Sequence, residues 1–331
     1  MIMNSGLKAA TWTKRTAENL DHIFEAPVRP PAASDGYGRL VGAAGFLSPE
    51  AGQAGELVAR LTRRNPDEAR ALVAFGCLWV DDRPFSDPVR SLAGHSHFRF
   101  NPPAYGPVRF YEADPGRIVH EDDDLLIYHK EAGRPSQGVP YDAHNNVLAA
   151  LGRLLTGRGG PAGLWLPHRL DAETSGLLLL AKNQAAAGAV GRAFQAGQVT
   201  RTYLALGLGA RPERDFFQVE AAIAKEGARY VTRPEGPGRA ARTDFTVLDQ
   251  RDFAPGAPEM KEILFRAEPL TGRTHQIRLH LALAGWPVRG DRFYGRAEVE
   301  EASPAPRLML AAVGLGLPHP ARAGRLEVSL V

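Results

Sequence analysis

The fold is decided by one stretch of sequence, Pro167-His-Arg-Leu-Asp-Ala-Glu-Thr-Ser-Gly-Leu-Leu-Leu-Leu-Ala-Lys182. A run of polar residues, 168–175, leads directly into the apolar segment 176–181, which predicts a polar loop followed by a buried strand. Polar side chains on a loop beside a rigid strand are well placed to act on a ligand. A purely structural alternative is an Asx-type turn, in which Asp171 accepts hydrogen bonds from backbone amides.

A second polar cluster, Thr271-Gly-Arg-Thr-His-Gln-Ile-Arg-Leu-His-Leu281, opens a predicted helix over 275–284. Basic and hydroxyl side chains at the start of a helix are typical of an anion site. A charged surface helix is the alternative. His275 and His280 are five residues apart and fall on different helix faces, so this pattern does not favour a two-histidine metal site.

Strand and helix signals alternate from about residue 117 onward. Strands are predicted at 125–128, 176–181 and 202–206, and helices at 147–155 and 185–196. Several strand pairs have the short connections of hairpins, so the sequence predicts an α+β fold with a mixed, largely antiparallel sheet.

The N-terminal third divides into two parts. Residues 1–50 contain a Pro-rich stretch, 26–34, and are predicted to form an irregular arm. Residues 51–107 predict two short helices, the second beginning at Pro66, followed by a strand at 78–80 and a hairpin. The helices carry four arginines, Arg60, Arg63, Arg64 and Arg70. The remaining segment, 108–331, is predicted to be the catalytic domain.

Composition limits the class of protein. With 44% apolar and 23% charged residues, the 331-residue chain can form a sizeable core and is not a disordered protein. Its single cysteine, Cys77, excludes an intramolecular disulfide framework and a Cys-rich zinc site and favours a reducing compartment. No apolar stretch is long enough for a transmembrane helix and the first residues lack a signal-peptide core, so we expect a cytoplasmic protein without a membrane partner.

Arginine dominates the basic residues, with 34 arginines among 40 Lys+Arg. This bias is explained either by genomic base composition or by a surface that binds phosphates bidentately. The sequence leaves both explanations open.

Several motifs together resemble those of the RluA-type pseudouridine synthases. The segment His168-Arg-Leu-Asp-x-x-Thr-Ser-Gly176 resembles their signature loop, and further similar segments follow in family order: 199–205, 271–278, 281–295 and 307–320. The resemblance covers about 117–331. Departures are Arg201 for the usual lysine, Glu131 for the usual proline and Ala311 for the usual histidine, with individual loops at 234–238 and 253–259.

The segment 55–100 is similar to an S4-type RNA-binding domain, in which two helices precede a hairpin. Gly76-Cys-Leu-Trp-Val-Asp-Asp-Arg83 stands where that family has its hairpin signature, with Asp82 in place of glycine or asparagine. The alternative is a small helical cap with an Arg-rich, solvated face.

The resemblance implies a pseudouridine-synthase-type sheet and the isomerisation of uridine in RNA. The N-glycosidic bond breaks, the uracil turns and a C–C bond forms, without a cofactor or a metal. By this resemblance Asp171 is the catalytic carboxylate, acting as nucleophile at C1′ or as base in an elimination. Arg278 would be its charge partner, and Tyr203 would stack on the uracil or handle its proton.

The same resemblance implies RNA-binding roles for further residues. Arg169 would replace the flipped base or hold its phosphate, and Ile277 would form an apolar wall. His168 and Thr174 would brace the loop, and Arg201 and Arg273 would lie where RNA phosphates pass.

Alternatives differ in substrate and in class. Large-subunit ribosomal RNA is favoured because of the S4-like segment, transfer RNA is the alternative, and a monomer is the default. A non-catalytic RNA-binding protein is disfavoured because Asp171, Tyr203 and Arg278 are all present. A hydrolase using Ser175 lacks the G-x-S-x-G context, and a dinucleotide site at Gly207 lacks the third glycine.

Overall fold

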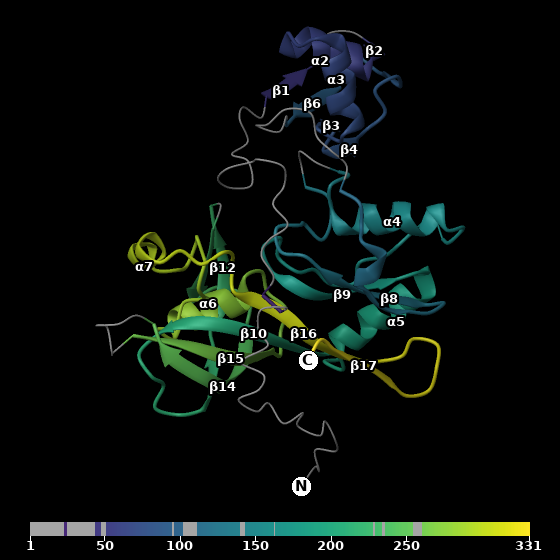
Figure 1. Ribbon diagram of the computed structural model, residues 1–331. Coiled ribbons are helices and arrows are strands. Elements are labelled where there is room, and N and C mark those ends of the chain that lie inside the picture. The colour runs from purple at the N-terminus through teal and green to yellow at the C-terminus, as the bar shows by residue number, and fades with distance from the viewer. Residues whose placement is uncertain are drawn as a thin grey trace. The chain divides into compact units, whose positions relative to one another are not determined.

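The computed structural model describes residues 23–24, 44–47, 51–94, 96–101, 111–139, 143–161, 163–227, 229–233, 236–253 and 260–331 (Figure 1). The chain separates into two compact units. The first comprises Met1–Val28, Ile118–Gly133 and Leu170–Val331, and the second comprises Arg29–Arg117 and Arg134–Arg169. The segment 134–169 thus belongs to the second unit, whereas the sequence placed it with the C-terminal domain. Most of the expected arm 1–50 and parts of the two individual loops lie outside the described residues.

The first unit is built on a nine-stranded sheet with the order β11-β14-β15-β10-β16-β9-β8-β7, and β17 pairs with β16. The strands are β7 Ile118–Glu121, β8 Leu125–Lys130, β9 Ser175–Ala181, β10 Thr200–Gly209, β11 Phe216–Glu220, β14 Arg242–Asp252, β15 Lys261–Pro269, β16 Leu310–Pro318 and β17 Arg325–Ser329. Among these strands only β9 and β16 pair in parallel. The mixed, largely antiparallel α+β fold predicted from the sequence is confirmed.

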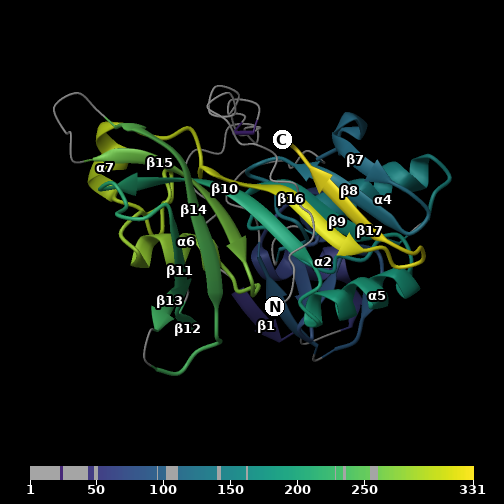
Figure 2. The same ribbon diagram turned by 90° about the horizontal axis from the view of Figure 1, so that it is seen from below.

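The remaining elements of this unit lie on or beside the sheet. They are the hairpin β12 Ala222–Glu226 and β13 Arg229–Arg233, and the helices α5 Gln184–Gln195, α6 Gln276–Leu283 and α7 Ala297–Ala302. The 3₁₀ turn η2 Pro115–Arg117 belongs to the second unit. Figure 2 shows the sheet running without a break from β14 through β10 and β16 to β8.

The apolar run of the deciding stretch is buried on both faces of the sheet. All seven residues of β9 are buried, and alternate leucines, Leu177 and Leu179, pack with Val190 of α5. The helix begins where the Asn183 side chain accepts a hydrogen bond from the Ala186 amide, at 2.8 Å. A strand that is covered on both sides reads as a continuous apolar run, which is why the sequence identified it.

Two glycines of β10 allow an aromatic cluster to close over the sheet. A Cβ at Gly207 would lie 2.8 Å from the Phe265 ring, and one at Gly209 would lie 2.7 Å from Trp286. Phe217, Phe245, Phe265 and Trp286 contact one another there. Gly207-Leu-Gly209 is therefore explained by close packing rather than by a nucleotide site.

A short N-terminal segment belongs to the core of the first unit. Ile23 and Phe24 are buried with residues of β10, β15 and β16. Arg307 donates to the Ile23 carbonyl at 3.1 Å, and its guanidinium lies 5.4 Å from the centre of the Phe24 ring. This part of the expected irregular arm therefore packs on the sheet.

The second unit has the elements expected at 51–100. Helices α2 Ala54–Thr62 and α3 Pro66–Ala74 pack on a sheet of order β1-β6-β3-β4, beside a short pair β2–β5. The strands are β1 Ala44–Leu47, β2 Gly52–Gln53, β3 Leu78–Val80, β4 Arg83–Phe85, β5 Ser91–Leu92 and β6 His97–Phe100, and helix α4 Val147–Gly157 completes the unit.

Asp81 and Asp82 both have positive φ, 48° and 60°, in the two-residue β3–β4 turn. This turn requires left-handed backbone, which explains why glycine or asparagine suits the site.

Within the part of the chain that the structure describes, no helix is long and apolar enough to cross a membrane.

We predict that Gly176→Ala strongly destabilises the first unit. Gly176 has φ +111°, and a Cβ there would lie 2.0 Å from the Ala312 carbonyl oxygen across the parallel β9–β16 pair. Backbone strain and overpacking together should cost on the order of 3 kcal/mol. Urea unfolding measures the loss.

The matched control is Gly191→Ala in α5, where a Cβ meets nothing within 4 Å. There alanine should stabilise by roughly 0.5–1 kcal/mol because glycine is a weak helix former. Equal midpoints for Gly176→Ala and the wild type would contradict the close approach of β9 and β16.

Candidate active site

Asp171 lies on a tight loop whose backbone is held by a buried lysine, Lys130. The Thr174 amide donates to the Asp171 carbonyl at 3.1 Å, which closes the loop just before β9. The fully buried Lys130 donates through Nζ to the Ala172 carbonyl at 2.9 Å, and the Gly133 amide donates to the same oxygen at 2.8 Å. The loop is therefore held by its backbone, which leaves the Asp171 side chain, 27% exposed, available for contacts.

The guanidinium of Arg278 lies between two carboxylates. Arg278, on α6, is 2% exposed and binds Asp291 bidentately: Nε and Nη2 each lie 2.7 Å from an Asp291 oxygen. Its remaining nitrogen, Nη1, lies 3.4 Å from Asp171 Oδ2. Asp291 thus holds the guanidinium plane and directs its free edge toward Asp171.

The charges of this site keep Arg278 protonated. Burial alone would lower the pKa of Arg278, but the hydrogen bonds and charge of Asp291, with the charges of Asp171 and Glu173, raise it above its ordinary value. A cation that stays charged in a buried position gives Asp171 a permanent partner.

Tyr203 and Ile277 complete the predicted centre. Tyr203, on β10, is 8% exposed, and burial raises the pKa of its hydroxyl, against the opposing charge of Arg201 and together with the charge of Asp171. The phenol therefore stays protonated, and the negative charge of Asp171 contributes to this. Ile277 is buried next to Arg278 on α6.

Arg201 and Arg273 use their side chains within the protein. Arg201 Nη2 donates to the carbonyls of Pro269 and Thr271, at 2.9 and 3.0 Å. Arg273 Nε donates to the Ala240 carbonyl at 3.0 Å, and burial, with the neighbouring charge of Arg239, lowers the Arg273 pKa. Both arginines brace the loop before α6, and their contact with RNA phosphate stays a prediction.

The other predicted RNA-binding residues divide between the two units. Thr174 is buried in the loop of the first unit. His168 and Arg169 end the second unit, where His168 is half-buried and Arg169 is exposed. Their predicted roles toward the base and its phosphate stay predictions.

Hydrogen bonds of Gln276 account for several polar residues of the second cluster, 271–281. Its side-chain oxygen accepts from Thr271 Oγ1 at 2.8 Å, and its amide donates to Thr243 Oγ1 at 3.0 Å. Thr243 Oγ1 is 2.9 Å from His280 Nδ1, and His280 Nε2 is 3.2 Å from the Ala221 carbonyl. Burial lowers the pKa of His280, so this chain of bonds ties α6 to β14 without a net charge.

The sequence predicted no role for Asp291, Tyr294, His275 or Glu173, although His275 and Glu173 lie in the two polar clusters. A signal for Asp291 existed, because a buried arginine requires a carboxylate and Asp291 lies in a motif already noted. Glu173 faces the same centre: burial raises its pKa, against the charges of Arg278 and Arg292. His275 and Tyr294 are identified by their geometry alone.

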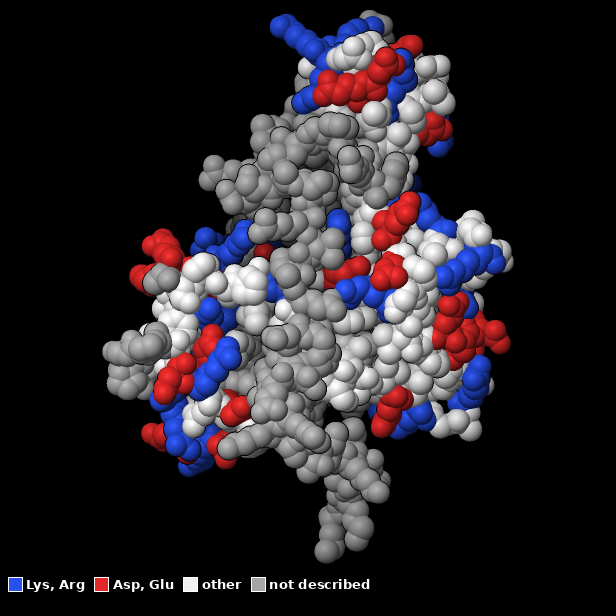
Figure 3. Space-filling view, in the orientation of Figure 1, with Lys and Arg blue, Asp and Glu red and all other residues white. Residues whose placement is uncertain are grey.

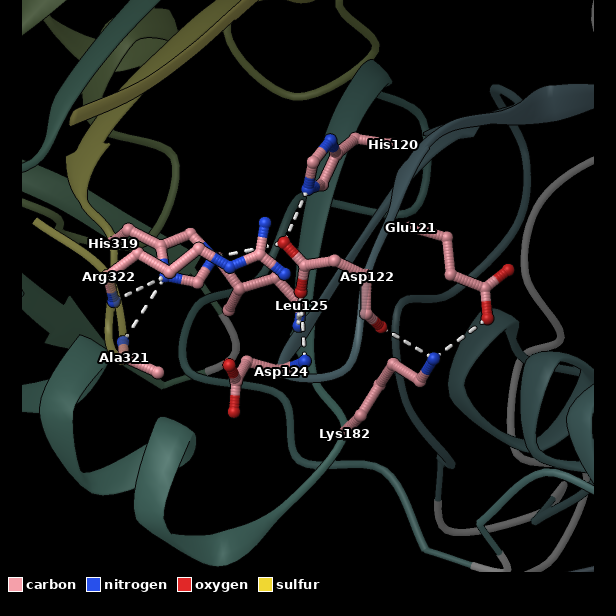
Figure 4. A network of polar contacts seen from close by, with 9 residues as sticks. All are labelled: His120, Glu121, Asp122, Asp124, Leu125, Lys182, His319, Ala321 and Arg322. Carbon is pink, nitrogen blue, oxygen red and sulfur yellow. Dashed lines mark hydrogen bonds and ion pairs between the residues drawn. The ribbon is translucent and has the colours of Figure 1, made fainter. Parts of the chain in front are cut away.

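One group of side chains outside this centre has the composition of a metal site. Asp122, Asp124 and His319 place ligand atoms within 4.8 Å of one another. Figure 4 shows hydrogen bonds on the side chains of Asp122 and His319, and Asp124 Oδ1 accepts a hydrogen bond from Asn183 Nδ2 at 2.9 Å. His319 Nδ1 accepts from two backbone amides, so Nε2 donates to Asp122 Oδ2 at 2.9 Å, and Asp122 Oδ1 accepts two further amides. This group therefore acts as a joint between the β7–β8 turn and the loop after β16.

Comparison with known proteins agrees with this geometry. The family model for RNA pseudouridylate synthase matches residues 124–283. An uncharacterized RNA pseudouridine synthase of Aquifex aeolicus is 30% identical over 282 residues, which cover 79% of this chain and 85% of that protein. The chain belongs to the RNA pseudouridine synthase family. The family and the enzyme class predicted from the motifs are confirmed.

Other relatives carry more specific names. Ribosomal large subunit pseudouridine synthase C of Vibrio cholerae is 33% identical over 214 residues, and the match covers 64% of each chain. Ribosomal large subunit pseudouridine synthase D of Zymomonas mobilis is 27% identical over 278 residues, 80% of this chain and 84% of that one. The structure of human RNA pseudouridylate synthase domain containing 1 aligns with a TM-score of 0.52 and 28% identity, over 69% of this chain and 86% of that one.

We predict that the Asp122 joint makes the stability of the first unit sensitive to acid. Burial alone would raise the pKa of Asp122, but hydrogen bonds from His319, the Leu125 and Asp124 amides and His120 hold it well below its usual range. A carboxyl whose pKa is depressed by folding stabilises the protein above the unfolded pKa, about 3.9, and loses this contribution as the pH falls.

Wild type should therefore lose about 1–2 kcal/mol more than Asp122→Asn between roughly pH 5 and pH 2, measured by urea unfolding. The exposed neighbour Asp123→Asn is the control and should follow the wild type. Parallel curves for wild type and Asp122→Asn would contradict the role of the joint.

Proposed function

We propose that this protein isomerises specific uridines of large-subunit ribosomal RNA to pseudouridine, with Asp171 as the catalytic carboxylate. One observation carries the proposal: Arg278 is fixed by Asp291 and turns its remaining edge toward Asp171, at 3.4 Å. Such a partner stabilises negative charge on the carboxylate, which is what attack at C1′ or removal of a C2′ proton needs.

The reaction is balanced within the nucleotide. The N1–C1′ bond breaks, the C5–C1′ bond forms, C5 gives up its proton and N1 gains one. Asp171 can act on the ribose either as a nucleophile at C1′ or as a base, and both routes remain open. The protonated Tyr203 phenol is suited to stack on the uracil or to exchange its proton.

A uridine stacked in RNA must leave the stack to reach Asp171, at a cost of a few kcal/mol. The exposed guanidinium of Arg169 can take the place of the base or hold its phosphate. Stacking of the uracil on Tyr203 would offset about 1–3 kcal/mol of the cost of flipping. Base flipping therefore fits the residues of the signature loop.

Ribosomal RNA is proposed over transfer RNA because two relatives are named as ribosomal large subunit synthases and match over 64% and 84% of their lengths. Figure 3 shows acidic and basic side chains intermingled on the described part of the face that it draws, so we look to particular arginines for RNA contacts. On the second unit, Arg64 and Arg70 pair with Glu68 and Asp67. Arg60 and Arg63 are exposed on α2 and at its end, and we propose that they contact RNA.

We also propose that the protein acts as a monomer in the cytoplasm. Asp171, Arg278, Asp291 and Tyr203 all come from one chain, and the chain has a single, buried cysteine, Cys77, which fits a reducing compartment. Light scattering of the purified protein tests the first point, because a dimer mass would contradict it.

The direct test is pseudouridine mapping on unmodified transcripts of large-subunit ribosomal RNA and on a transfer RNA pool. Wild type should produce a new pseudouridine in the ribosomal RNA. Asp171→Asn should produce none while RNA affinity stays within a few-fold, because Arg278 keeps Asp291 as its partner. The exposed Asp215→Asn is the matched control and should behave as wild type.

Pseudouridine found only in transfer RNA would preserve the chemistry and overturn the proposed substrate. Full activity of Asp171→Asn would overturn the assignment of the carboxylate. No product from wild type in either RNA would contradict the proposed substrates altogether.

The role of the second unit is tested by charge reversal. Arg60→Glu with Arg63→Glu should weaken RNA binding and reduce the slope of log affinity against log salt by about 1–2, because two phosphate contacts are lost. The control pair, Arg192→Glu with Arg322→Glu, changes the net charge equally on the first unit. Equal slopes for the two double variants would contradict the RNA-binding assignment of 51–107.

A further inference from the structure

We propose that His275 is a positioning residue for Asp171: Tyr294 holds its imidazole in the Nε2–H form, and this N–H, together with Arg278, directs one carboxylate oxygen away from the ribose. The inference rests on the proposed function, because it assigns how that carboxylate is held during the reaction. It adds a second hydrogen-bond donor to the ion pair already described.

His275 has a left-handed backbone that directs its side chain toward Asp171. His275 precedes α6 with φ 57° and ψ 20°, the left-handed region that residues with a Cβ rarely adopt. Its side chain makes no capping hydrogen bond. Strained residues concentrate at functional sites, and here the strain aims the imidazole at the carboxylate: Nε2 lies 3.8 Å from Asp171 Oδ2.

The tautomer of His275 follows from the groups that face its two nitrogens. The Tyr294 hydroxyl can donate or accept, whereas the carboxylate oxygen of Asp171 on the other side of the ring can only accept, so the nitrogen that faces Asp171 is the donor. The hydroxyl proton of Tyr294 is then free to point at His275 Nδ1, which lies 2.7 Å away. An Nδ1 that accepts a hydrogen bond leaves the ring proton on Nε2, the nitrogen that faces Asp171.

Aromatic rings fix the orientation of the imidazole. Phe293 stacks on it at 25° with the ring centres 6.1 Å apart, and Tyr230 meets it edge-on at 5.6 Å. Tyr294 packs against it from a third direction, at 5.5 Å. Little rotational freedom remains to be lost when the substrate binds.

Burial keeps this donor neutral. Burial lowers the pKa of His275, the charges of Asp171 and Asp291 oppose this, and Arg278 adds to it, with a lowered pKa as the result. Burial likewise raises the pKa of Tyr294, so the phenol keeps the proton that it donates. A neutral imidazole orients the carboxylate without supplying a proton to it.

Both donors approach the same oxygen. Arg278 Nη1 lies 3.4 Å and His275 Nε2 lies 3.8 Å from Asp171 Oδ2. Oδ1 is then the oxygen presented to the ribose. The His275 contact is longer than a hydrogen bond, and such contacts commonly shorten when the substrate closes the site.

Three variants separate the roles of the two ring nitrogens, Nδ1 and Nε2. His275→Asn keeps an amide near Nδ1, tolerates the left-handed backbone and loses the donor to Asp171. His275→Gln restores an amide donor near Nε2. Tyr294→Phe keeps the ring but removes the hydroxyl that fixes the tautomer.

Single-turnover rates are measured with enzyme in excess, beside RNA affinity and thermal unfolding of each variant. His275→Asn should slow the reaction about 10- to 100-fold, the factor for a lost hydrogen bond to a charged group. Its RNA affinity should stay within about threefold, because the change is in positioning. His275→Gln should react about tenfold faster than His275→Asn. In a plot of rate against pH, the fall in rate on the acidic side should occur at a higher pH for His275→Asn than for wild type. The other titratable groups of this centre, namely Glu173, Tyr203, Arg278, Asp291 and Tyr294, are unchanged in His275→Asn and His275→Gln.

A second readout does not depend on activity. Long-range ¹H–¹⁵N correlation spectra of histidine-labelled protein, assigned with His275→Asn, should show the Nε2–H form of His275 in wild type and a mixture of both tautomers in Tyr294→Phe. An Nδ1–H form in wild type would overturn the inference even if a variant failed to fold.

Failure of the inference is distinguishable from failure of the proposed function. If wild type forms pseudouridine, Asp171→Asn does not and His275→Asn keeps the wild-type rate, only the role of His275 is overturned. If wild type forms no pseudouridine in any RNA, the proposed function is overturned and the role of His275 with it.

Discussion

The burial of one guanidinium determines the arrangement of the candidate active site. Moving an ion out of water costs several kcal/mol, and only a well-placed counter-ion with good hydrogen bonds offsets that cost. Asp291 supplies this to Arg278 through two bonds of 2.7 Å. Because two of its nitrogens are occupied there, the guanidinium presents a defined third one to Asp171. The geometry of the carboxylate therefore depends on a residue that does not touch it.

The fold keeps both ends of this ion pair in place. On one side Lys130 and Gly133 bind the carbonyl of Ala172, and Gly176 lets β9 approach β16 closely enough to hold the loop. On the other side the hydrogen bonds of Gln276 fasten the start of α6 to β14. Two segments more than a hundred residues apart in sequence are thus braced separately, each by buried polar groups whose partners are backbone atoms or neutral side chains.

The sequence predicted those features that a local pattern determines. The continuous apolar run of β9, the helices at 184–195 and 276–283 and the antiparallel sheet all follow from periodicity and turn residues. The pairing of Asp171 with Arg278 came from the family resemblance. The roles of Asp291, His275 and Tyr294 were not predicted, because they depend on contacts across the fold: a bidentate bond, a left-handed backbone and a hydrogen bond between two side chains leave no periodic signal. In Gly207-Leu-Gly209 the glycines serve the packing of Trp286, which a sequence pattern cannot separate from a weak ligand motif.

We expect Asp291 to act on the reaction through Arg278. A double-mutant cycle on the single-turnover rate tests it, with Arg278→Lys, Asp291→Asn and the combined variant compared with wild type at saturating enzyme. If the claim holds, each single variant is slow and the double variant is no slower than Arg278→Lys, because the guanidinium that Asp291 directs is already absent. If the two losses instead multiply, Asp291 acts independently of Arg278, and the account of this site is wrong.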